Sequence, residues 1–253
     1  MIHYHGTPIG GTRDEVARFV ANRHMFVPFP RAEDLPIVAE ASASFAFDNG
    51  AFSAWKRGAK VRWKDYFQWC KEWIRHPGLD FCIIPDVVEG TEAENDKLIS
   101  KWISFDGWRG EQWHATHYGV PVWHFHESME RLNRLCKGWP RIALGSSGDW
   151  PNPGTDGWWR RLGLAMKVIC DEKGRPRCKV HGLRMLAMDL FDKIPFASAD
   201  STNVAQNNGL LRRFGMYTPP TSSQRAEVIA SRIEAVNSPA VWSSETKQLE
   251  LYE

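Results

Sequence analysis

Long apolar runs are absent from this chain of 253 residues. A helix that crosses a membrane needs about 20 consecutive apolar residues, and no run here approaches that length, so we expect no membrane partner. A strong excess of one charge is also missing, because the formal net charge is only +2. Without a global basic field, any contact with nucleic acid has to use local patches. The candidate patches are Arg160-Arg161, residues 173–179 and Arg212-Arg213.

Cysteine is scarce and irregularly spaced. The chain has five cysteines, an odd number, and it opens on the strand-like Met1–His5 rather than on a targeting segment. We therefore expect reduced thiols in a cytoplasmic protein. Cys170, Cys178 and His181 offer zinc ligands, but their spacing matches no strong zinc signature. We interpret the two cysteines as structural thiols and expect no metal or other cofactor.

Eight short apolar runs alternate with helical or loop segments, an arrangement that favours a parallel sheet. The runs are Ile2–His5, Met25–Pro28, Ser44–Phe47, Leu79–Ile84, Val120–Trp123, Arg141–Leu144, Lys179–Val180 and Ile194–Ala199. Eight runs in about 250 residues predict one closed (β/α)8 barrel of the TIM type over residues 1–237, with a polar tail at 238–253. A doubly wound open sheet is the alternative, but the glycine fingerprint of a dinucleotide-binding fold is absent.

Helices are expected between these runs. Their predicted bounds are 14–22, 62–74, 91–102, 128–136, 158–169 and 226–236. Thr12 is a predicted N-cap, and Thr91 with Glu94 forms a predicted capping box.

The last apolar run ends abruptly in Asp200-Ser201-Thr202-Asn203. A carboxylate at the end of a buried strand is held on a rigid support at the edge of the core. Asp200 is therefore a candidate nucleophile. The alternative is that it caps the next helix, since Asp, Ser, Thr and Asn are all good N-caps.

Other runs end in polar or glycine-rich residues in the same way. These residues are His5, Asp48, Asp86, His124, His126, Gly145–Asp149 and His181. In a (β/α)8 barrel the loops after the strands form the active-site face, so we expect these ends to converge on one pocket. Each carboxylate also has a local explanation, such as a turn between Asp48 and Gly50. Three carboxylates together favour a functional site over three separate local explanations, because burying a carboxylate without a partner is energetically costly.

The glycine-rich stretch Gly145–Gly148 places backbone N–H donors where a ligand can approach closely. It lacks the Lys and Thr of a P-loop, so a phosphate and a flat heterocycle both remain open as its ligand.

The order of these motifs resembles that of the tRNA-guanine transglycosylase superfamily, most closely its shortened phage branch, which inserts 7-deazaguanines into DNA. Five segments carry the resemblance over roughly Ile2 to Asn207: Asp48-Asn49-Gly50-Ala51-Phe52, Ile84-Pro85-Asp86, Leu144–Gly148, Val180–Leu183 and Ser198–Thr202. Asn49 stands where the family usually has Ser. The family's zinc-binding Cys-x-Cys-x-x-Cys insertion is absent, which favours DNA over tRNA and argues against zinc.

The resemblance implies base exchange through a covalent sugar–enzyme intermediate. Asp200 is implied as the nucleophile and Asp48 as the group that moves the proton to and from the base. Asp86 is implied to accept hydrogen bonds from the base, and the Gly145–Gly148 amides to donate to its O6. The implied substrate-binding set is completed by Asn49, Gly50, Ser146, Ser147, His181 and Gly182. The implied partners are DNA and a 7-deazaguanine base, in the host cytoplasm if the protein is phage-encoded.

The arginines at positions 160, 161, 212 and 213 are the candidates for phosphate contacts. The target nucleotide would have to leave the base stack to reach the pocket.

Two other classes of function fit the same residues. A glycosidase or nucleosidase would use the carboxylates with water as the acceptor. A non-catalytic barrel that binds nucleic acid would not need them for chemistry.

Overall fold

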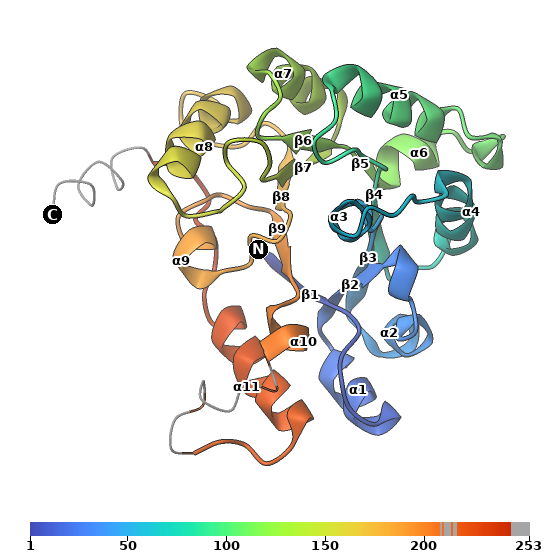
Figure 1. The fold of residues 1–253 in the computed structure, drawn as a ribbon, viewed down its shortest axis with the longest axis vertical. Coiled ribbons are helices and arrows are strands. Elements are labelled where there is room, and N and C mark those ends of the chain that lie inside the picture. The colour runs from blue at the N-terminus through green and yellow to red at the C-terminus, as the bar shows by residue number, and fades with distance from the viewer. Residues whose placement is uncertain (208, 210–213, 215–216, 244–253) are drawn as a thin grey trace, which may run out of the picture.

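The computed structural model describes residues 1–207, 209, 214 and 217–243. Nine parallel strands form a nearly closed barrel with helices between them, as the ring of strands in Figure 1 shows. The strands are β1 (Ile2–Gly6), β2 (His24–Pro28), β3 (Ser44–Asp48), β4 (Leu79–Ile83), β5 (Gly119–Val120), β6 (Val122–His124), β7 (Arg141–Gly145), β8 (Lys179–Gly182) and β9 (Ser198–Ser201). Their order in the sheet is β5-β4-β3-β2-β1-β9-β8-β7-β6. The predicted α/β barrel is therefore confirmed.

The ninth strand arises because one expected run is split at Pro121. The segment before it, β5, pairs with β4, whereas the segment after it, β6, pairs with β7. Proline has no N–H to donate to a neighbouring strand. Its carbonyl still accepts a hydrogen bond from the Ala143 N–H at 2.9 Å. The two short strands together occupy the place of the fifth predicted run and join the two ends of the sheet.

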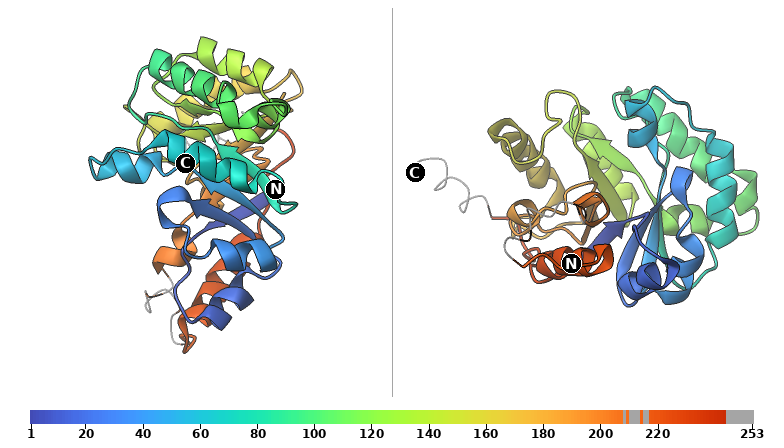
Figure 2. Two further views of the ribbon diagram at one scale, coloured as in Figure 1. Left: turned by 90° about the vertical axis from the view of Figure 1, so that its right-hand side faces the viewer. Right: turned by 60° about the horizontal axis from the view of Figure 1, so that its bottom comes forward.

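Helices follow the strands around the outside of the barrel (Figures 1 and 2). They are α1 (Arg13–Val20), α2 (Leu35–Ala41), α3 (Ala51–Lys56), α4 (Trp63–Trp73), α5 (Glu92–Ile103), α6 (Trp113–Tyr118), α7 (Met129–Gly138), α8 (Asp156–Ile169), α9 (Met188–Phe191), α10 (Asn203–Asn207) and α11 (Ser222–Glu234), with short 3-10 turns η1 (Phe29–Arg31) and η2 (Asp106–Trp108). Thr12 and Thr91 cap α1 and α5, each within a capping box, as predicted for Thr91.

The last strand begins later than the apolar pattern indicates. The run Ile194–Ala199 was expected to be the strand, but β9 spans Ser198–Ser201. Pro195 cannot donate to a neighbouring strand, and Ile194 and Phe196 pack into the core instead. As a result Asp200 lies within the strand rather than beyond its end.

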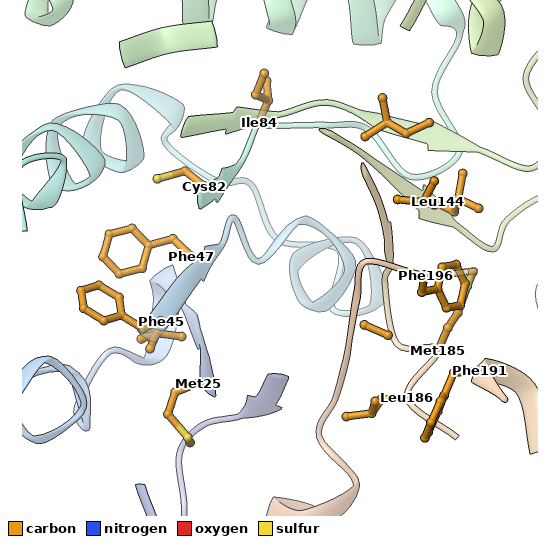
Figure 3. Close-up of a cluster of buried hydrophobic side chains, with 14 of the residues drawn as sticks. Met25, Phe45, Phe47, Cys82, Ile84, Leu144, Met185, Leu186, Phe191 and Phe196 are labelled. Carbon is orange, nitrogen blue, oxygen red and sulfur yellow. The ribbon is translucent and has the colours of Figure 1, made fainter. Parts of the chain in front are cut away.

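Apolar side chains form two separate clusters. A small one fills the lumen of the barrel and includes Tyr4, Phe26, Phe81 and Ile83. A large one lies between the strands and the helices. Part of it is drawn in Figure 3, where Met25, Phe45 and Phe47 project from neighbouring strands.

Candidate functional site

A cavity of about 120 Å³ opens at the carboxyl ends of the strands. Asp48, Asp86 and Asp200 all line it, although they come from β3, the loop after β4, and β9. The other lining residues are Phe26, Asn49, Phe52, Ile83, Val88, His124, Gly145, Ser146, Pro151, Pro153, Leu183 and Arg184. The expected meeting of three carboxylates at one mouth is therefore present in the structure.

Asp200 is buried and is held by groups from the preceding strand and loop. Its Oδ1 accepts a hydrogen bond from the Arg184 backbone N–H at 2.9 Å, and the Nε2 atom of His181 lies 3.3 Å away. The helix that follows begins at Asn203, and Ser201 Oγ, rather than Asp200, accepts the Asn203 N–H at 2.9 Å. The described contacts thus fix Asp200 toward the pocket and do not make it a helix cap.

Arg184 holds an unusual backbone conformation beside Asp200. Its φ of 58° lies in the left-handed region, which non-glycine residues rarely adopt and which costs on the order of 1 kcal/mol or more. This conformation accompanies the hydrogen bond from its N–H to Asp200. The guanidinium group lies over the Phe52 ring, 3.9 Å from the ring centre. Nothing in the sequence points to Arg184, because a positive φ at an arginine leaves no mark in the residue pattern.

Asp48 is half-buried at the pocket wall. Burial raises the pKa of its carboxyl to about 7, and the neighbouring Asp200 and Asp86 add to the rise, against the lowering effect of the Gly50 N–H. That N–H donates to Asp48 Oδ1 at 3.0 Å, so the turn considered as the local explanation is also present. Gly50 has a φ of 76°, and a Cβ there would lie 2.7 Å from Pro30, so only glycine fits. Asp48 can therefore exchange a proton near neutral pH.

Asp86 belongs to a buried hydrogen-bonded network. Asn49 Nδ2 donates to Asp86 Oδ1 at 2.7 Å and to the Ile84 carbonyl at 2.9 Å. His124 Nε2 lies 2.9 Å from Asp86 Oδ2. His124 Nδ1 is buried and has no hydrogen-bond partner within the described part of the chain. Sequence reasoning placed His124 at a strand end but gave it no role.

Only half of the predicted glycine-rich stretch reaches the pocket. Gly145 and Ser146 line it, and Ser146 Oγ accepts from the Trp158 indole at 2.9 Å. Ser147 is buried against His126, with 2.7 Å between its Oγ and Nδ1 of that ring. The Gly148 N–H donates to the carboxylate of Glu89. Gly148 does not line the pocket and its N–H is engaged by Glu89, so the implied contact between this amide and a base stays a prediction.

Three other predicted residues lie outside the lining. His181 is fully buried behind Asp200, its Nδ1 lies 2.8 Å from Ser198 Oγ, and burial lowers its pKa. A Cβ on Gly182 would meet the Phe196 ring at 2.8 Å, so this glycine permits close packing rather than ligand contact. His5 faces α11, where its Nε2 lies 2.9 Å from Glu234. The position of His5 within β1 turns it away from the pocket.

The two predicted arginines on α8 have different surroundings in the fold. Arg160 is exposed, whereas Arg161 donates to the carbonyls of Phe125 and Glu127 and lies over the Trp150 ring. Arg161 therefore serves the packing of α8 rather than an open surface. Arg212 and Arg213 lie outside the described residues.

Within the described ranges, no group of three or more His, Cys, Asp or Glu side chains is placed to hold a metal ion. Cys170 and Cys178 are buried free thiols, and both ring nitrogens of His181 face Ser198 and Asp200. The possible zinc set therefore does not come together. Across the same described residues, none of the helices is long and apolar enough to span a membrane.

No protein-family model and no curated protein matches this sequence. A solved structure from Aquifex aeolicus VF5, described as a structural study, can be superposed on this chain. It aligns with 92% of this chain and 90% of its own, at a TM-score of 0.48 and 10% sequence identity. The fold and the site together define an α/β barrel with a carboxylate-lined pocket at its carboxyl end.

Proposed function

We propose that this barrel is a base-exchange transglycosylase that replaces guanine in a nucleic acid, most naturally DNA, with a 7-deazaguanine such as 7-cyano-7-deazaguanine. One observation carries the proposal. Asp48 and Asp200 reach the same small pocket from different strands, in environments that suit different tasks. Enzymes that act at the anomeric carbon of a sugar usually carry two carboxyl groups with distinct environments at one site.

Asp200 is suited to the role of nucleophile. The Arg184 N–H holds one carboxylate oxygen at 2.9 Å, so the group points into the pocket in a fixed direction. Attack of the free oxygen on C1′ forms an ester bond between Asp200 and the sugar, while the bond to guanine breaks with its electron pair leaving on the base. The incoming base then displaces Asp200 from the same carbon, which restores the carboxylate and retains the configuration.

Asp48 is suited to the role of acid and base. With a pKa of about 7 it is partly protonated at neutral pH, so it can give a proton to the departing guanine. The resulting carboxylate can then take a proton from the incoming base. Asp86, with donors from Asn49 and His124 on its two oxygens, is oriented to accept N–H groups of a purine-like ring.

The proposal is tested by incubating the protein with guanine-containing DNA and an isotope-labelled 7-deazaguanine, and analysing the digested nucleosides by mass spectrometry. We expect the labelled base in DNA and an equal amount of released guanine. A parallel reaction with tRNA identifies the polymer, and the Asp200→Asn protein is the control. Release of guanine without incorporation would indicate a nucleosidase instead. No exchange with DNA or tRNA, for any 7-deazaguanine tried, would contradict the proposal.

A further inference from the structure

The segment that follows β3 is basic and largely exposed. Residues 51–64 contain no Asp or Glu and five cations: Lys56, Arg57, Lys60, Arg62 and Lys64. Residues 55–60 are all exposed. Arg62 pairs with Asp65, which follows the segment, whereas Lys56 and Lys60 have no acidic partner within the described residues. The segment therefore presents uncompensated positive charge to solvent.

Aromatic and guanidinium groups connect this segment to the pocket. Arg184 and Phe52 both line the pocket and stack on each other at 3.9 Å. The Phe52 ring lies 5.6 Å from the ring of Trp55, measured between centres, and Trp55 is 49% exposed. A row of flat groups in contact, with the Phe52 and Trp55 rings tilted by 47° to each other, therefore runs from the pocket to the surface, on the side where α3 projects from the barrel (Figure 2).

We propose that Phe52, Trp55, Lys56, Arg57, Lys60 and Arg184, here termed the basic rim, bind the nucleic-acid strand that flanks the target nucleotide. This inference rests on the proposed function. Flat side chains interleaved with cations are the pattern that recognises single-stranded nucleic acid, because bases stack on the rings while phosphates pair with the cations. An acidic peptide would satisfy the lysines but would leave the exposed Trp55 ring without a flat partner.

The basic rim offers the exposed cations for phosphate contacts that the predicted arginine pair on α8 lacks. Arg161 is committed to backbone carbonyls of its own chain, so α8 offers only Arg160 as an exposed cation from that pair. The segment after β3 offers three adjacent exposed cations, and it belongs to the same strand end as Asp48. A nucleotide in the pocket would therefore have its neighbours within the reach of α3.

The test uses the Asp200→Asn protein, so that binding is measured without turnover. Its affinity for short single-stranded DNA is followed by fluorescence anisotropy over a range of salt concentrations. A triple change of Lys56, Arg57 and Lys60 to Ala is compared with the matched triple Lys101→Ala, Lys137→Ala and Lys167→Ala. The control residues are exposed cations in the last turns of α5, α7 and α8, so both triples remove the same charge.

If each rim cation meets one phosphate, the slope of log affinity against log salt falls by about 2 in the rim triple, and the control triple keeps the parent slope. Trp55→Ala weakens binding about tenfold and leaves the slope unchanged, because stacking does not depend on salt in this way. Equal slopes in the two triples, or parent-like binding by Trp55→Ala, would overturn the inference. The same titrations with single-stranded RNA are run in parallel, because phosphate contacts are common to both polymers.

The two proposals can fail separately. Loss of slope in the rim triple without any base exchange by the parent would leave the basic rim as a nucleic-acid surface and remove the transglycosylase assignment. Base exchange by the parent with an unchanged slope in the rim triple would support the transglycosylase assignment and remove the basic rim as a nucleic-acid surface.

Discussion

The Nε2 atom of His124 lies 2.9 Å from the Oδ2 atom of Asp86, and both side chains are buried at the pocket wall. Asn49 occupies the other oxygen of Asp86, so the carboxylate is oriented by donors on both sides. If Nε2 carries the ring proton, the buried Nδ1 of His124 is an acceptor, and it has no partner in the described part of the chain.

This pair leads to a prediction about ligand binding. His124→Phe keeps a ring of similar size but removes both nitrogens, so Asp86 loses one of the two donors that orient it toward a bound base. We expect the affinity for a 7-deazaguanine base to fall about 10–100-fold. Isothermal titration calorimetry measures this directly.

His114→Phe is the matched control for His124→Phe. His114 is also a buried histidine, but it lies on α6 and does not line the pocket. An equal loss of affinity in the two variants would mean that His124 acts only through the general stability of the fold.

The raised pKa of Asp48 predicts a dependence of stability on pH. The folded protein holds this proton up to about pH 7, whereas the unfolded chain loses it near pH 4. Between these values the folded state binds more protons, so the contribution of Asp48 is present below about pH 4 and is lost as the pH rises to 7. Asp48→Asn has no proton to lose. It should be more stable than the parent at pH 8, by about 1–4 kcal/mol.

The difference between Asp48→Asn and the parent should shrink to about 0.5 kcal/mol at pH 4, where Asp48 is neutral in the folded state and about half protonated in the unfolded chain. Urea unfolding at pH 4 and pH 8 measures it, and comparing variant with parent cancels the other titrating groups. A variant that is less stable than the parent at pH 8 would show that Asp48 is not held in a desolvated site.

The packing role of Gly182 gives a test of the core. A methyl group there would lie 2.8 Å from the Phe196 ring and 3.0 Å from Met185, so Gly182→Ala should destabilise the fold by about 1–3 kcal/mol. Gly163→Ala is the matched control. Gly163 lies within α8, and a Cβ added there would have no neighbour within 4 Å, so this change should raise the free energy of unfolding by about 0.5–1 kcal/mol.

Thermal unfolding of the two alanine variants distinguishes the roles of these glycines. If Gly182→Ala unfolds like the parent but loses ligand affinity, the implied contact between Gly182 and the base is restored and the packing interpretation is wrong.

The sequence predicts the barrel well because the residue patterns that indicate strands and helices are local. Apolar runs, Pro and Gly breaks and the Thr91–Glu94 capping box all act within a few residues, and each appears in the structure. The three carboxylates could be assigned to one mouth because parallel strands bring all their carboxyl ends to the same face. The split of one run at Pro121 could not be foreseen, because it depends on which strands lie on either side.

The details of the pocket depend on contacts between distant residues. His124 and Asp86 are 38 positions apart, and nothing in either local pattern indicates their hydrogen bond. Arg161 looks like a surface cation in the sequence, yet its guanidinium group is taken by the carbonyls of Phe125 and Glu127. The contacts of Gly148 and Gly182 could not be read from the sequence for the same reason, since Glu89 and Phe196 reach them from other elements.

The central claim is that Asp200 forms a covalent bond to the sugar. Asp200→Asn keeps an oxygen that can accept the Arg184 N–H, so the fold and nucleic-acid binding should persist, but an amide cannot form the sugar ester. The decisive measurement is denaturing gel electrophoresis of the protein mixed with labelled guanine-containing DNA. We expect a covalent complex with the parent, which disappears when the second base is added, and none with Asp200→Asn. A covalent complex of equal yield with Asp200→Asn would contradict the account.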